Sequence, residues 1–111
     1  MVGTPLGVGG GETVAGLRAD LLRVKGNPPR DAAAVFELAL VTTSHVKVGI
    51  YDLAGRRLRL LYDGLLEAGR HDIHWDGRDQ AGDRAKPGVY LVQARNVERG
   101  TIVGTRLTFL R

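Results

Sequence analysis

Residues 69–79 read Gly69-Arg70-His71-Asp72-Ile73-His74-Trp75-Asp76-Gly77-Arg78-Asp79 and hold the single tryptophan of the chain. Side chains alternate in character up to Trp75, which is typical of a strand with one buried face. An Asp-Gly pair, a strong turn signal, follows at once. A large aromatic residue where a strand meets a turn is typical of a sandwich core that closes over its own end. The pattern therefore predicts a core position for Trp75 and no catalytic pocket around it.

Six further segments show alternation or short apolar runs. Together with 71–75, they predict strands at 21–25, 34–40, 46–51, 57–62, 89–97 and 101–110. The three leucines Leu58, Leu60 and Leu61 break strict alternation, so we expect a β-bulge or two-sided burial there. No segment has the period of a helix. Seven short strands separated by turn signals predict an all-β, antiparallel sandwich of two sheets with almost no helix.

Turn residues separate these segments. They predict breaks at 26–29, 42–44, 54–55, 64–69, 76–87 and 99–100, and the break at 76–87 is the longest polar connection. Prolines in the first break remove donors from a β-ladder. Tyr90 follows Pro87-Gly88 and resembles a tyrosine corner, in which the hydroxyl binds a backbone group near the start of a strand.

The chain is expected to contain one folded domain. Its 111 residues suit a single core. Residues 1–19 are rich in glycine and read as a linker or flexible tail, whereas residues 20–111 carry the β pattern. The glycines of the tail do not form a dinucleotide-binding loop, because Glu12 occupies the third glycine position and no strand precedes them.

Charge and hydropathy exclude several function classes. The net charge is +4, with both signs interleaved, and cysteine is absent, so disulfides and thiolate metal sites are excluded. Arg56-Arg57-Leu58-Arg59 is the one basic run, and it reads as the solvated side of a strand, so no nucleic-acid partner is expected. No apolar run approaches about 18 residues, so no membrane insertion is expected. The start of the chain also lacks a signal-peptide pattern.

Three aspartates form the best candidate for a cation site. Asp76, Asp79 and Asp83 lie in the 76–87 break and could supply calcium with hard oxygen ligands. Their spacing differs from that of an EF-hand. Aspartate next to glycine more often binds its own backbone and shapes a turn. We therefore expect no resident cofactor, and calcium remains the alternative.

The other reactive side chains give weaker candidates. His71 and His74 are three apart in a strand and point to opposite faces, so they cannot share a zinc ion. Ser44 precedes His45 in a predicted turn without the glycine frame of a nucleophile elbow. No acid–base pair lies in an apolar context. We expect no enzymatic activity.

A series of short motifs also occurs in a fixed order along the chain. The series is Asn27-Pro28, Val46-x-Val48-x-Ile50-Tyr51-Asp52-x-x-Gly55-Arg56, Asp63-Gly64, Ala68-Gly69-x-His71, Trp75-Asp76-Gly77-x-Asp79-x-x-Gly82 and Gly88-Val89-Tyr90. It resembles the immunoglobulin-like domain of the FlgD (flagellar hook-capping) type, which is similar to the C-terminal sorting domains of type IX (Por) secretion. The resemblance implies a seven-stranded immunoglobulin-like β-sandwich over about 21–111. Its structural signature residues are Gly55, Trp75, Asp76, Gly77, Gly88 and Tyr90.

The resemblance also implies a non-catalytic role at the bacterial cell surface or outside the cell. The first hypothesis is a C-terminal module for export, surface attachment or scaffolding, with a passenger encoded upstream and secretion or surface machinery as partner. The second is a structural subunit that pairs with copies of itself through sheet edges or its N-terminal tail. The third is a calcium- or glycan-binding sandwich that uses the 76–87 loop. Fold alone does not choose among them.

Overall fold

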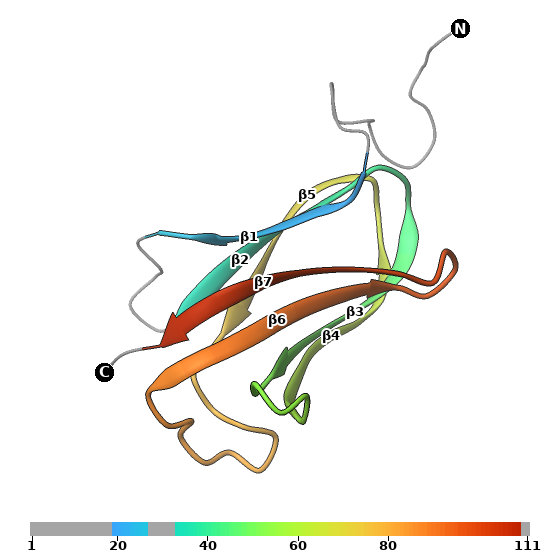
Figure 1. The fold of residues 1–111 in the computed structure, drawn as a ribbon. Helices are drawn as coiled ribbons and strands as arrows, with labels where there is room; N and C mark the ends of the chain where they lie inside the picture. Colours follow the sequence, from blue (N-terminus) through green and yellow to red (C-terminus); the bar gives the residue numbers. More distant parts are fainter. Residues whose placement is uncertain (1–18, 27–32, 110–111) are drawn as a thin grey trace, which may run out of the picture.

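Seven strands in two facing antiparallel sheets make up the computed structural model, which describes residues 19–26 and 33–109 (Figure 1). The strands are β1 (Leu21–Lys25), β2 (Ala34–Leu40), β3 (Ser44–Tyr51), β4 (Arg57–Leu66), β5 (Gly69–Trp75), β6 (Gly88–Asn96) and β7 (Thr101–Phe109). One sheet has the order β1-β2-β5 and the other β4-β3-β6-β7. The described residues contain no helix, and hence none that could cross a membrane. The predicted all-β, immunoglobulin-like sandwich is confirmed.

The core lies between the two sheets and is closed at one end by aromatic rings. Trp75 is fully buried, as are Phe36 and Leu38 of the neighbouring strand. The Trp75 ring lies 5.9 Å from the Tyr90 ring and 5.2 Å from the Phe109 ring, measured between centroids. These rings come from both sheets, so the aromatic cluster joins the two layers at the end where β5 stops.

Strand β2 is buried on both faces. Phe36 and Leu38 belong to the core, whereas Val35 and Ala39 face away from it yet are 4% and 2% exposed. β2 is the middle strand of its sheet, and its outward residues pair with longer side chains on β1 and β5. Such side chains shield short neighbours with their aliphatic stems.

Strand β4 contains the predicted irregularity. Val48 pairs with Tyr62 while Gly49 pairs with Leu60, so Leu61 is an extra residue in the ladder. A second register shift makes Leu58 extra in the same way. Both leucines pack against the core. The bulges therefore turn two side chains inward that strict alternation would expose.

Several predicted strand boundaries were wrong, and β6 is Gly88–Asn96 where 89–97 was predicted. The 64–69 loop is shorter than expected, because β4 continues to Leu66 and β5 begins at Gly69. Gly64 lies inside the strand and pairs with Val46, and a Cβ at this position would stand 3.2 Å from the Tyr62 hydroxyl oxygen. Ser44 opens β3 and is not a turn residue; it is 2% exposed, and its hydroxyl donates to the Thr42 carbonyl oxygen at 3.0 Å. The predicted tail lies outside the described residues apart from Ala19.

Candidate functional site

The candidate site is the end of the sandwich where the long 76–87 loop meets the turn between β3 and β4 (Figure 1). One aromatic side chain holds each end of the loop. The Trp75 indole Nε1–H donates to the Arg78 carbonyl oxygen at 2.9 Å, and the Tyr90 hydroxyl donates to the carbonyl oxygen of Lys86. Tyr90 thus has the contact of a tyrosine corner. Both contacts tie loop backbone to the core aromatic cluster.

The loop aspartates accept hydrogen bonds from the loop itself. Asp79 Oδ1 accepts from the backbone N–H groups of Ala81 at 3.0 Å and Asp83 at 2.9 Å. Asp76 Oδ1 accepts from the N–H of Arg78 at 3.0 Å. These are the contacts by which aspartate shapes turns. Within residues 19–26 and 33–109, no three metal-ligating side chains come together, so Asp76, Asp79 and Asp83 do not form one cluster.

Gly77 is the loop position where both the backbone conformation and the close neighbours favour glycine. Its φ is +83°, a conformation that side chains disfavour. A Cβ there would also lie 3.1 Å from the Ala33 Cβ and 3.2 Å from the Phe109 ring. The loop backbone therefore touches the aromatic end of the core directly, and this explains a glycine between Asp76 and Arg78.

The β3–β4 turn is built in the same way around Asp52. Its Oδ1 accepts from the N–H groups of Ala54 at 3.0 Å and Arg56 at 2.9 Å, and its Oδ2 accepts from Arg56 Nε at 2.9 Å. These bonds, with the Arg56 backbone N–H first among them, hold the pKa of Asp52 below its ordinary value. Gly55, with a φ of +88°, completes the turn.

The 76–87 loop is docked on the edge of β4. The Gln80 N–H donates to the Leu58 carbonyl oxygen at 2.8 Å, and its side-chain Oε1 accepts from the Leu60 N–H at 3.0 Å. Arg59 Nη1 donates to Asp76 Oδ1 at 3.0 Å and to the Arg78 carbonyl oxygen at 3.3 Å. Sequence reasoning missed Gln80 and this use of Arg59. The loop covers backbone groups that an edge strand would otherwise expose.

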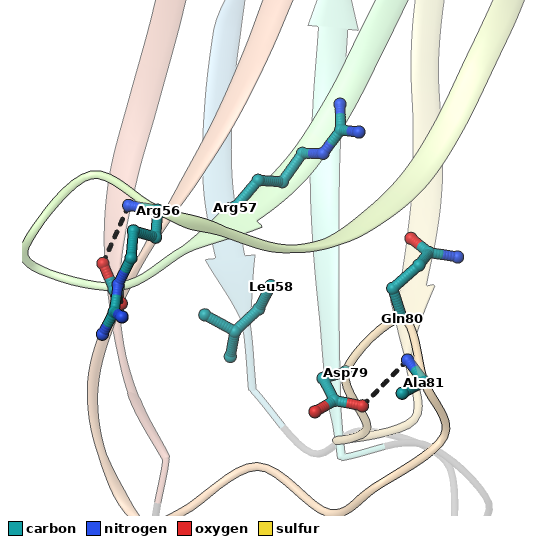
Figure 2. Close-up of a pocket in the computed structure, with 7 residues that line it drawn as sticks. Arg56, Arg57, Leu58, Asp79, Gln80 and Ala81 are labelled. Atoms are coloured by element: carbon teal, nitrogen blue, oxygen red, sulfur yellow. Dashed lines mark hydrogen bonds and ion pairs between the residues drawn. The ribbon is translucent and has the colours of Figure 1, made fainter.

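A recess of about 400 Å³ lies between the turn and the docked loop (Figure 2). Its lining residues are Asp52, Arg56, Arg57, Leu58, Asp79, Gln80 and Ala81. Figure 2 shows Leu58 between the Arg56 side and the Asp79 side of the recess. Asp52, Arg56 and Asp79 already bind neighbouring groups. These three charged side chains of the recess therefore stabilise the turn and the loop. The recess is better suited to contact with another protein than to catalysis.

The remaining predicted candidates lie apart. His71 Nε2 is 2.6 Å from the Glu67 carbonyl oxygen, and His74 is exposed on the opposite face of β5. Ser44 is buried, whereas His45, the next residue, points outward and its Nε2 lies 2.6 Å from Asp63 Oδ1. Neither pair has the geometry of a shared metal site or of a nucleophile with its base. The basic run is likewise divided, since Arg56 binds Asp52 and Arg59 binds the loop.

Comparisons with known proteins agree with this architecture. The sequence model described as the FlgD Ig-like domain matches residues 29–100. Among solved structures, FlgD from P. aeruginosa has a TM-score of 0.57 at 23% identity, covering 82% of this chain and 74% of that chain. PorZ, described as an essential bacterial surface component of the type-IX secretion system of Porphyromonas gingivalis, has a TM-score of 0.50 at 27% identity. That match covers 81% of this chain and 11% of PorZ. No curated protein matches the chain.

Proposed function

The chain belongs to the FlgD Ig-like domain family, as its motif series predicted, and from this premise we propose a non-catalytic module that acts through contacts with other proteins. The observation that carries the proposal is that the signature residues stabilise the loop and its contact with the core. Trp75 and Tyr90 donate hydrogen bonds to loop backbone, Asp76 accepts from the Arg78 N–H within the loop, and Gly77 allows the loop to approach the Phe109 ring. Because the signature residues stabilise the fold, we infer that other proteins are recognised by the outer surfaces of the sandwich.

Within this role, we propose export or surface attachment of a passenger protein. The support comes from PorZ, a surface component of a type-IX secretion system, in which the similar segment is 11% of a longer chain. A module of that kind would work at the cell surface or outside the cell. Its partners would be the passenger, the secretion or surface machinery, or both.

A second candidate function is self-assembly through sheet edges. One observation favours it: Leu65, on the part of edge strand β4 that Gln80 does not cover, is 64% exposed. An exposed apolar side chain on an edge strand can be buried against a second copy of the chain. Light scattering at high protein concentration distinguishes this function, because a monomer throughout would remove it.

The experiment that tests the first proposal is a secretion assay. A reporter protein is fused upstream of this chain and expressed in a bacterium that has a type IX secretion system. We expect the reporter on the cell surface or in the medium. Two controls are the reporter alone and the fusion with Trp75→Ala, which disrupts the core. Retention of the intact fusion inside the cell, with the chain folded, would contradict the proposal.

A further inference from the structure

The two sheets differ in how many of their charged side chains form ion pairs. The three-stranded sheet has five charged side chains besides histidine, and all five form ion pairs. The pairs are Arg23–Glu37 at 2.9 Å, Arg70–Glu37 at 3.2 Å and Lys25–Asp72 at 3.2 Å. This face satisfies its own charges.

The four-stranded sheet has a cationic excess. Strands β3, β4, β6 and β7 contain a single carboxylate, Asp63. Asp63 is engaged by His45, whose hydrogen bond is the largest cause that lowers its pKa, and it is attracted by Lys47. Within the described part of the chain, Arg95 of β6 and Arg106 of β7 have no ion pair. Both are exposed.

A notch lies between these two arginines. Gln93 of β6 pairs with Gly104 of β7, and both residues line a hollow of about 290 Å³. Leu91, Gln93 and Arg106 are among its lining residues. The pairs Leu91–Arg106 and Arg95–Ile102 flank the notch on either side along the strands. Figure 1 shows β6 and β7 side by side along their length.

The spacing between Arg95 and Arg106 along the strands matches the spacing between side chains of an extended peptide. Arg106 and Arg95 lie in the rows before and after the notch, two residues away in each direction. These rows are about 13 Å apart at 3.3 Å per residue. Side chains of an extended peptide that are two positions apart share one face. A segment with an apolar residue at its centre and carboxylates two positions to either side would thus meet the notch and both arginines.

We propose that this face of β6 and β7 is a docking surface for an acidic, extended segment of a partner protein. The apolar side chain of that segment enters the notch at Gly104, and its carboxylates bind Arg95 and Arg106. Arginine suits this task because its fork binds carboxylates with defined geometry. The inference deepens the proposed function and rests on it, since it names the surface and the chemistry of the partner.

The test uses a nine-residue peptide of threonines with leucine at the centre and aspartate two positions to either side. Its binding is followed by the amide NMR signals of the ¹⁵N-labelled chain. We expect shifts that cluster at 91–95 and 102–106. Replacing the central leucine by alanine should weaken binding about tenfold, and replacing the aspartates by lysines should abolish it. Absence of shifts at millimolar peptide, or shifts that cluster in the 76–87 loop, would overturn the proposal.

A pair of charge-reversed variants separates a specific site from general attraction. Arg95→Glu with Arg106→Glu should weaken peptide binding about tenfold or more. Arg84→Glu with Lys86→Glu changes the net charge equally, but in the loop at the other site, and should leave binding within about twofold. Gly104→Val fills the notch and should also weaken binding about tenfold. Equal loss in both charge-reversed variants would overturn the proposal.

The outcome is separable from that of the secretion assay. If the reporter reaches the cell surface but the peptide does not bind, this docking surface is refuted and the proposed function stands. If the peptide binds as expected but the reporter is retained, export is refuted and the docking surface stands.

Discussion

Replacing Trp75 by alanine is the most informative perturbation of this fold. The side chain is fully buried, contacts the Tyr90 and Phe109 rings, and donates a hydrogen bond to the Arg78 carbonyl oxygen. Removing a large aromatic side chain from a core costs about 3–5 kcal/mol, because a cavity remains. A domain of this size has a total stability of about 5–15 kcal/mol. Trp75→Ala should therefore remove a large fraction of the free energy of unfolding.

Trp75→Phe divides this loss into two parts. The smaller ring keeps most of the packing but lacks the N–H group, so the Arg78 carbonyl oxygen keeps only the longer hydrogen bond from Arg59 Nη1 at 3.3 Å. Losing one typical hydrogen bond costs about 0.5–1.5 kcal/mol. The phenylalanine variant should thus fall between the wild type and Trp75→Ala.

Urea unfolding followed by far-ultraviolet circular dichroism measures both variants without relying on tryptophan fluorescence. Leu65→Ala is the control, since this side chain is 64% exposed and its loss should cost less than about 0.5 kcal/mol. A loss below about 2 kcal/mol for Trp75→Ala would refute the reasoning, because the ring would then not close the core.

Four other changes test the loops and charges. Gly77→Ala should lower the free energy of unfolding by about 1–2 kcal/mol more than Gly82→Ala does, because both have positive φ but only Gly77 also has close neighbours; urea unfolding of the two variants makes the comparison. Gln80→Ala should cost about 1 kcal/mol in the same assay, since the Leu60 N–H loses its partner, whereas Gln93→Ala should cost almost nothing. The pKa of Glu37 is lowered chiefly by its hydrogen bond from Arg23. The stability that Glu37 contributes is therefore present above its ordinary pKa of 4.5 and is lost as the pH falls through the lower folded value. In a plot of the free energy of unfolding against pH, Glu37→Gln should flatten that part of the curve, and an unchanged curve would count against the ion pairs. Millimolar calcium should leave the melting temperature unchanged, because the three loop carboxylates are not gathered; a rise of several degrees would contradict this.

Local sequence patterns predicted most of the strands, because apolar side chains at every second position mark the face that packs against the core. β1 and β2 have the predicted bounds, and Trp75 ends β5 where the Asp-Gly signal follows. The error at 64–66 has a specific cause: Gly64 was read as a turn residue, yet it is a strand residue beside the Tyr62 ring. Glycine marks both situations, and only the tertiary neighbour distinguishes them.

The candidate site was less predictable, since it depends on contacts between distant residues. The sequence predicts the turn-shaping role of Asp79, because aspartate near glycine commonly binds its own backbone. The docking of Gln80 on β4 and the contacts of Arg59 join residues about 20 positions apart, and no local pattern marks them. The cationic face likewise needs the sheet order, which places Arg95 and Arg106 on neighbouring strands.

The motif-rich 76–87 loop is part of the folded scaffold, held by hydrogen bonds within the loop and to β4. Native-state hydrogen exchange measures this at the amides of Asp79, Gln80 and Ala85. These donate to backbone carbonyl oxygens of Asp83, Leu58 and Gly77, each at 2.8 Å. We predict that all three amides exchange as slowly as those in the central strands. Exchange at the rate of an unstructured peptide would show that the loop is not part of the folded scaffold.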